Sequence, residues 1–262
     1  MEAVKRFFSQ SLIAGKAILG PFDLVQFLCF QVGYSLLTLI FYCVLASFTT
    51  GSYDLTRWVV GNSLVLCVNT CIFSLGGVFN TDRYFGRLRI IIVSPMNLLA
   101  VILQKGVISI LISLATVIGG FIIGGLIFGV DFTNMNFGVF IIAALSATFS
   151  AAGMGLMMSA LALLTDSMYL ILNVVASLIL LLSGANFPTT QLPIIVQYVA
   201  KIFPLNRAVA AANMAFSDFE INNYVRLILG EILLGICFYI FAFVMLKIIE
   251  RVAIKKASLE MF

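Results

Sequence analysis

The chain has 262 residues, of which 62% are hydrophobic and 10% are charged, and it carries a formal net charge of +4. Because soluble domains have about 25% charged residues, this composition excludes a chain that covers a globular surface with polar groups, and its solvent must be lipid. The small positive charge argues against a nucleic-acid-binding surface. Histidine is absent from the sequence, and all five cysteines (Cys29, Cys43, Cys67, Cys71 and Cys237) fall inside apolar segments, which argues against a zinc site and against disulfides.

Residues 1–20 are the first predicted element, a helix that lies in the plane of the membrane interface. At 100° per residue, Phe7 and Phe8 fall on an apolar side, whereas Lys5 and Arg6 fall on the opposite, polar side. A cleavable signal would need an unbroken apolar core after its basic start, and this segment has none. A solvated tail is the alternative for the same residues.

Six segments are long and apolar enough to cross a bilayer as helices, a crossing that takes about 20 residues. Backbone polar groups in lipid must pair within their own segment, which favours helices over other structures. The predicted fold is therefore an all-α integral membrane protein with six transmembrane helices, forming one transmembrane domain over residues 1–262. The six predicted spans are residues 22–48, 58–79, 99–130, 137–164, 168–187 and 227–247.

The distribution of basic residues predicts the orientation in the membrane. Six spans place both ends of the chain on the same side. Of the fifteen lysines and arginines, eleven fall on that side (Lys5, Arg6, Lys16, Arg83, Arg87, Arg89, Lys105, Lys247, Arg251, Lys255 and Lys256) and four on the other (Arg57, Lys201, Arg207 and Arg226). The positive-inside rule then predicts a multi-pass protein of the plasma membrane with both termini in the cytoplasm.

The 80–97 loop, between the second and third spans, concentrates charge in a chain that otherwise avoids it. It carries an aspartate and three arginines within eight residues and ends in a Ser-Pro pair. Such a segment offers a charged surface to a partner in the cytoplasm. Anchoring by positive charge alone is the alternative, although anchoring requires only the arginines. The residues singled out in this loop are Asp82, Arg83, Gly86, Arg87, Arg89, Ser94 and Pro95.

Between the fifth and sixth spans, prolines interrupt a region that is otherwise apolar. Pro188, Pro193 and Pro204 prevent one continuous helix. The pieces between them, residues 194–203 and 207–216, are too short to cross the membrane. Residues 188–218 are therefore predicted to form a re-entrant helical hairpin on the outer side, called the outer hairpin here, and broken helices of this kind line transport routes. A loop lying on the membrane surface is the alternative.

Two features together resemble the type-2 ATP-binding-cassette exporter permease family. One is the 80–97 loop, in which Asp82-Arg83 and Gly86 precede Ser94-Pro95. The other follows the fifth span: Ser183-Gly184 precedes a series of prolines in Phe187-Pro188, Leu192-Pro193 and Phe203-Pro204-Leu205. The six spans, the interfacial first helix and the length agree with the family, so the resemblance covers essentially the whole chain. Leu88-Arg89 stands where the family usually carries a second acidic residue.

The resemblance implies that the 80–97 loop is a coupling helix, seated in a groove of a separate cytoplasmic ATPase. The sequence contains no Gly-x-x-x-x-Gly-Lys-Ser/Thr phosphate-binding loop. The chain is therefore predicted not to be an enzyme and to hold no cofactor, since ATP and magnesium would bind the partner subunit. A second permease half, identical or related, is expected because six spans and one hairpin leave an open groove. Membrane lipid is the other expected partner.

Polar and aromatic residues within two of the spans are predicted to line a translocation path. The resemblance places the second and fifth spans at the axis between two permease halves, so residues on those spans could face the cargo. Hydrogen bonding between helices is the alternative for the asparagines. The predicted path residues are Asn62, Asn69, Phe73, Tyr169 and Asn173.

An outer gate is predicted where the outer hairpin meets the sixth span. Its residues are Phe187, Pro188, Pro193, Pro204 and Glu231. An acidic residue within a span is a functional candidate by default, and the expected partner of Glu231 is Arg226, Arg207 or Lys201. A purely structural ion pair, or a protonated acid, is an equally good reading.

Composition bears on the nature of the cargo. With 24 Phe, 10 Met and few charges within the spans, the chain suits an amphipathic or lipophilic cargo, such as a drug in multidrug efflux or an antimicrobial peptide. Export of a lipid-linked polysaccharide by the same architecture is an alternative. An ion-coupled secondary transporter is an alternative of a different class, for which Glu231 and Asp23 are the only acids near the membrane. The predicted function is ATP-driven export.

Overall fold

The computed structural model describes residues 9, 11, 33–51, 54–84, 86, 98–131, 135–165, 167–216 and 219–256. Within these ranges the chain consists of helices joined by turns and short loops, without strands, so the predicted all-α class is confirmed. The helices are α3 (Tyr34–Thr50), α4 (Thr56–Gly76), α5 (Val78–Tyr84), α7 (Leu98–Phe128), α8 (Phe137–Ala162), α9 (Met168–Leu182), the 3-10 turn η2 (Thr189–Gln191), α10 (Ile194–Ala200), α11 (Asn206–Asn213) and α12 (Ile221–Lys256).

Apolar helices occur at all six predicted spans, but they differ in length. Four of the described helices are long and apolar enough to cross a membrane: Thr56–Tyr84, Val101–Phe128, Phe137–Ala162 and Ile221–Ile249. The apolar helices Leu36–Thr50 and Met168–Leu182 are shorter. A helix of 15 residues is only about 22 Å long, against roughly 30 Å of hydrocarbon. Six complete crossings therefore remain a prediction, and the predicted interfacial helix at 1–20 lies almost wholly outside the described residues.

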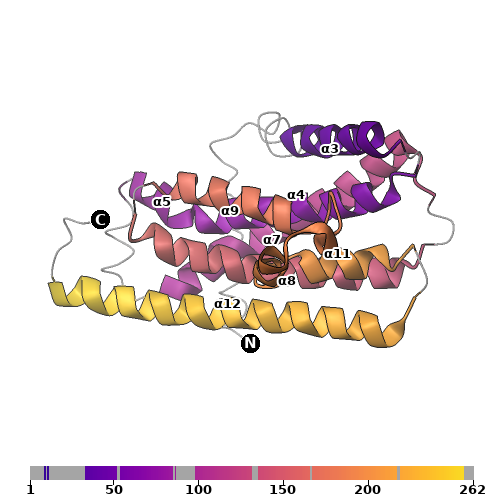
Figure 1. Ribbon diagram of the computed structural model, residues 1–262. Helices are drawn as coiled ribbons and strands as arrows, with labels where there is room; N and C mark the ends of the chain where they lie inside the picture. The colour runs from indigo at the N-terminus through magenta and orange to yellow at the C-terminus, as the bar shows by residue number, and fades with distance from the viewer. Residues whose placement is uncertain are drawn as a thin grey trace.

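The long helices lie side by side in an elongated bundle, with α3 and α12 at opposite edges and α4, α8 and α9 between them (Figure 1). Successive apolar helices alternate in direction, as a chain that crosses a membrane repeatedly must do. Following the predicted orientation, we call the end with α5 the inner end. The opposite end, with residues 183–191, is called the outer end. Which end faces the cytoplasm is itself a prediction.

Helices α4 and α8 form the centre of the bundle. Both are buried along most of their length, and α4 packs on α7 and α8 while α12 packs on the other side of α8. Glycines permit this close approach: a Cβ atom on Gly153 would lie 2.9 Å from the Gly235 carbonyl oxygen, and one on Gly155 would lie 2.9 Å from the Leu75 Cβ. Small residues commonly let membrane helices pack in this way.

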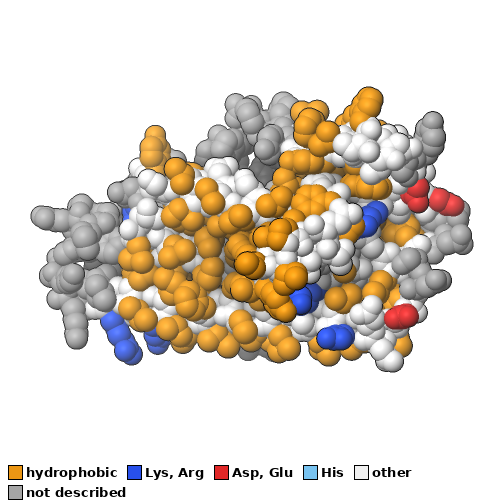
Figure 2. All heavy atoms as spheres, viewed as in Figure 1, with side chains coloured by type: hydrophobic (Ala, Val, Ile, Leu, Met, Phe, Trp, Pro, Cys, Tyr) orange, Lys and Arg blue, Asp and Glu red, His pale blue; other side chains and the backbone are white. Residues whose placement is uncertain are grey.

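The surface of the bundle fits a lipid environment. Large apolar side chains are exposed along the flank, and charged side chains gather mostly toward the two ends (Figure 2). A soluble protein would not expose so much apolar surface. The exposed residues include Phe41, Phe48, Leu126, Leu170 and Leu233. The structure thus agrees with a multi-pass membrane protein.

The region of the outer hairpin contains the helix breaks expected from its prolines. Pro193 directly precedes α10, and Pro204 lies in the turn before α11. Helix α11 packs inward on α8, α12 and α4, and buries Ala208, Val209, Ala211 and Ala212. Helix α10 instead exposes Ile194 and Ile195. Two short helices therefore lie where they were predicted, and their depth in the membrane remains a prediction.

Candidate functional site

The inner end of α5 is fastened to the bundle by a buried ion pair. Asp82 is only 2% exposed, and its carboxylate pairs with the Nζ of Lys105 on α7. A buried carboxylate is costly unless it is paired, so this contact fixes the position of α5 against α7. Asp82 therefore anchors the first residues of the 80–97 loop to the bundle.

Arg83 attaches the start of the 80–97 loop to the end of α8. Its guanidinium donates hydrogen bonds to the carbonyl oxygens of Ala162 at 3.2 Å, Leu163 at 3.1 Å and Thr165 at 3.0 Å. The last carbonyls of a helix have no partner within the helix, and the negative end of the helix dipole favours a cation there. Arg83 thus caps the inner end of α8 and joins it to the start of the 80–97 loop.

Of the remaining predicted coupling residues, the structure describes Gly86 alone. Gly86 is exposed and adopts a φ of 68°, in the left-handed region that favours glycine. Arg87, Arg89, Ser94 and Pro95 lie outside the described residues. Contact of any of these residues with an ATPase stays a prediction.

At the outer end, the loop after α9 is seated on the first turns of α4. The Asn62 amide nitrogen donates to the Trp58 carbonyl oxygen at 2.9 Å and to the Asn186 Oδ1 at 3.0 Å. The Trp58 indole nitrogen donates to the Asn186 carbonyl oxygen at 2.9 Å. A Cβ atom on Gly61 would lie 2.8 Å from the Ala185 Cα, so only glycine allows this seating. These contacts hold the loop 183–186 rigidly against α4.

The predicted path residues are spread along α4 and α9 and do not converge on one point. Asn62 is buried at the outer end, where its hydrogen bonds fit the structural alternative. Asn69 has a buried Oδ1 atom without a hydrogen-bond partner among the described residues. Tyr169 and Asn173 lie on the exposed side of α9, and the Asn173 amide donates to the Tyr169 carbonyl oxygen at 2.7 Å. Phe73 is half-buried. Lining of a path remains a prediction for all five.

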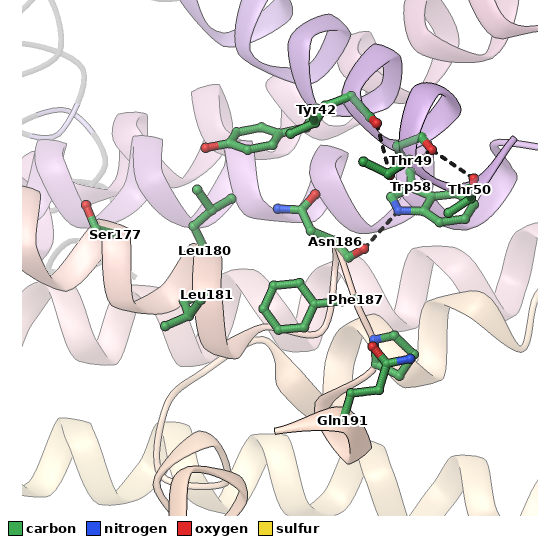
Figure 3. A pocket seen from close by; sticks show the side chains of 13 residues that line it. Tyr42, Thr49, Thr50, Trp58, Ser177, Leu180, Leu181, Asn186, Phe187 and Gln191 are labelled. Carbon is green, nitrogen blue, oxygen red and sulfur yellow. Dashed lines mark hydrogen bonds between the residues drawn. The ribbon is translucent and has the colours of Figure 1, made fainter. Parts of the chain in front are cut away.

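A pocket of about 540 Å³, which we call the outer pocket, lies between α3, the start of α4, the last turns of α9 and the loop that follows (Figure 3). It includes Phe187 and Pro188 of the predicted gate. Sequence reasoning missed its other residues, although Trp58 is the sole tryptophan of the chain and such residues favour membrane interfaces. The lining residues are Tyr42, Leu45, Ala46, Thr49, Thr50, Trp58, Ser177, Leu180, Leu181, Asn186, Phe187, Pro188 and Gln191.

Glu231 of α12 lies elsewhere, and it holds the turn before α11. It is completely buried, and its Oε1 accepts hydrogen bonds from the Ser150 hydroxyl of α8 and from the Leu205 backbone N–H, the latter at 2.9 Å. Leu205 has a φ of 90°, a strained conformation for a residue other than glycine. The carboxylate therefore stabilises a turn that the backbone alone disfavours.

Arg207, one of the expected partners of Glu231, acts on its carboxylate electrostatically without a direct ion pair. Arg207 lies close by, since a Cβ atom on Gly230 would be 2.9 Å from the Arg207 Cδ. The structure records no ion pair between Arg207 and Glu231, and the Arg207 Nη1 and the Glu231 Oε2 are buried without hydrogen-bond partners among the described residues. The predicted gate thus divides in two: Phe187 and Pro188 at the outer pocket, and Pro204 with Glu231 at α11. Pro193 starts the exposed α10.

The sequence model of the family described as ABC-2 type transporter matches residues 22–216. The matched region spans α3 to α11, and so includes the 80–97 loop, the outer pocket and most of the outer hairpin, but ends before α12 and Glu231. None of the curated proteins compared with the chain matches it.

Proposed function

Because the chain belongs to the ABC-2 type transporter family, we propose that it is the transmembrane subunit of an ATP-driven exporter. The family domain is the permease part of such transporters, and membership implies association with an ABC ATPase subunit. In the proposed assembly, the chain pairs with a second permease half, and two cytoplasmic ATPase subunits bind the 80–97 loops. The assembly moves an amphipathic or lipophilic cargo outward.

The observation that carries this proposal is the double attachment of α8. At its inner end, α8 is held by Arg83, next to the 80–97 loop. Farther along, its Ser150 binds Glu231, which also holds the turn before α11. The two attachments are separated by twelve residues, roughly 18 Å of rigid helix. A displacement of the 80–97 loop by a closing ATPase would therefore reach the outer hairpin through α8.

The character of the predicted path supports an amphipathic cargo. Tyr169 and Asn173 present an aromatic ring and an amide on the exposed side of α9, between apolar residues such as Leu170 and Val174. A strongly charged cargo would lose hydration on such a surface without gaining a counter-ion. A cargo with apolar and hydrogen-bonding parts fits better.

Purification and reconstitution test the proposal. The tagged full-length chain, isolated from its native membrane in gentle detergent, should carry a cytoplasmic ATPase with it. Proteoliposomes of that complex should accumulate a lipophilic fluorescent dye when ATP is supplied, and liposomes without the ATPase should not. The proposal fails if no ATPase co-purifies and transport persists without ATP but collapses with the proton gradient. Transport that persists without ATP and collapses with the proton gradient would instead identify an ion-coupled secondary transporter.

A further inference from the structure

The outer pocket lies in a groove between α3 and α9, with the start of α4 at its base. Both α3 and α9 pack on α4. Apolar side chains on the two flanking helices, Leu45 at 47% and Leu181 at 47% exposure, border the pocket and continue onto the outer apolar surface. A molecule that enters from the hydrocarbon of the bilayer can therefore reach the pocket without crossing water.

The lining of the outer pocket is uncharged but not uniformly apolar. None of the described residues that line it carries a charged side chain. A charged ligand would enter this site without a counter-ion, which is costly at low dielectric. Its lining includes hydroxyl and amide groups on Ser177, Asn186 and Gln191, and also the rings of Trp58 and Phe187. Pockets of this size with a few placed polar groups are typical of small-molecule sites.

The Asn186 side chain supplies a hydrogen-bond donor whose orientation is fixed. Its Oδ1 accepts from the Asn62 amide at 3.0 Å, and its backbone carbonyl accepts from the Trp58 indole at 2.9 Å. These two bonds leave the Asn186 amide nitrogen turned away from Trp58, toward the side of the pocket bordered by Tyr42 and Leu180 (Figure 3). Within the described part of the chain this nitrogen has no hydrogen-bond partner.

We propose that the outer pocket binds an uncharged amphiphile from the bilayer, which accepts a hydrogen bond from the Asn186 amide and lays its hydrocarbon chain against Leu45 and Leu181. The held donor selects a head group with an ester, ether or hydroxyl oxygen. The uncharged walls reject phosphate and ammonium head groups. Binding requires neither ATP nor a partner subunit, so it is separable from the proposed export.

Photolabelling with three matched probes tests head-group selection. The probes share one photoreactive acyl chain and carry a glycerol, a phosphate or a trimethylammonium head. Each is irradiated with the purified full-length chain in detergent micelles, and labelled peptides are identified by mass spectrometry. We expect the glycerol probe to label α9 and the loop 183–191 several-fold more strongly than the charged probes. Equal labelling of this region by all three would overturn the proposal.

Three variants locate the site. Leu181→Trp fills the pocket with an indole and should abolish labelling, whereas Leu178→Trp, on the same helix but outside the lining, should not change it. Asn186→Ala removes the donor and should lower labelling about fivefold, as expected for one net hydrogen bond. If that variant misfolds, the comparison at positions 181 and 178 still decides, because equal labelling of Leu181→Trp and the wild type also overturns the proposal.

A last experiment distinguishes whether the bound amphiphile is transported cargo or resident membrane lipid. The glycerol probe is bound to the chain in proteoliposomes, and then the ATPase partner and ATP are added before irradiation. Loss of labelling on ATP addition identifies the bound amphiphile as cargo. Retention of labelling identifies it as resident membrane lipid. Either result leaves the site and its chemistry as proposed.

Discussion

Replacement of Glu231 by alanine should destabilise the protein, because the buried Leu205 N–H loses its acceptor. The Ser150 hydroxyl and the Leu205 N–H both bind Oε1 in a site that is closed to solvent. The unsatisfied Leu205 N–H costs about 1–3 kcal/mol, whereas the Ser150 hydroxyl keeps the Ala147 carbonyl oxygen, at 3.1 Å, as an acceptor. For a chain of this size, 1 kcal/mol shifts the melting temperature by about 2–4 °C. Glu231→Ala should therefore lower the melting temperature by at least about 2 °C.

The assay uses three buried cysteines of the chain as reporters of unfolding. Cys43, Cys67 and Cys71 are buried, so a thiol-reactive fluorescent dye labels them when the protein opens in detergent. Ser150→Ala should cost less than Glu231→Ala, and the double variant should cost about as much as Glu231→Ala alone, because the two residues share one contact.

Ser159→Ala is the matched control for Ser150→Ala. Ser159 is an equally buried serine on α8 whose hydroxyl bonds only its own helix, at the Leu156 carbonyl. Its replacement should change the melting temperature little. The reasoning is refuted if Glu231→Ala melts like the wild type, or if Ser150→Ala and Ser159→Ala cost the same.

Three further changes test other contacts by the same thermal assay. Lys105→Met removes the ion-pair partner that α7 gives to the buried Asp82 carboxylate. It should cost about 2 kcal/mol, less than the loss of a fully buried pair, because Lys105 is partly exposed; no loss would mean that the pair does not form. Gly61→Ala should unseat the loop 183–186, whereas Gly119→Ala, where a Cβ meets nothing within 4 Å, should be harmless; equal effects would contradict the close approach. Asp54 accepts hydrogen bonding from Thr56 in the first turn of α4, and this lowers the pKa of the Asp54 carboxyl. The stability that the ionised Asp54 gives to the folded protein is therefore complete above the usual carboxyl pKa of about 3.9. It disappears as the pH falls through the lowered pKa. Asp54→Asn should accordingly flatten the acid side of a stability–pH curve, and an unchanged curve would contradict this role.

Helix positions could be predicted from the sequence because their signals are local. The apolar segments 99–130 and 137–164 became α7 and α8 with ends shifted by at most two residues. The prolines at 193 and 204 stand at the breaks around α10. Hydropathy located the ends of α12 less well: the predicted span 227–247 became Ile221–Lys256. A helix can continue beyond the membrane through residues that hydropathy excludes, because it pairs its own backbone groups in water as well.

The partners of the polar residues could not be predicted in the same way. Arg83 and Thr165 are 82 residues apart in sequence, Ser150 and Glu231 81, and Asn62 and Asn186 124. Composition marks such residues as unusual within a membrane chain, but only the packing of the helices decides which one meets which. An ion pair with Arg226, Arg207 or Lys201 was one expectation for Glu231. The fold instead places a backbone N–H and a hydroxyl against it.

The outer pocket could not be predicted from the sequence for a further reason. Its walls come from three helices and one loop, and its residues are ordinary ones that no motif marks. Only the seating of Asn186 on Trp58, which depends on the absence of a side chain at Gly61, turns these residues toward one space. Such a site arises from the assembled bundle and leaves little trace in sequence spacing.

The central claim is that a cytoplasmic ATPase binds the 80–97 loop. Retention of the ATPase by a chain with a charge-reversed loop tests this claim most directly. Arg87→Glu combined with Arg89→Glu is compared with Arg251→Glu, an exposed arginine on α12, by co-purification of the ATPase from detergent-solubilised membranes. Protease accessibility of intact membranes confirms equal insertion. The account predicts that the loop variant loses the ATPase and that the α12 variant retains it. Equal retention by both, with insertion intact, would contradict it.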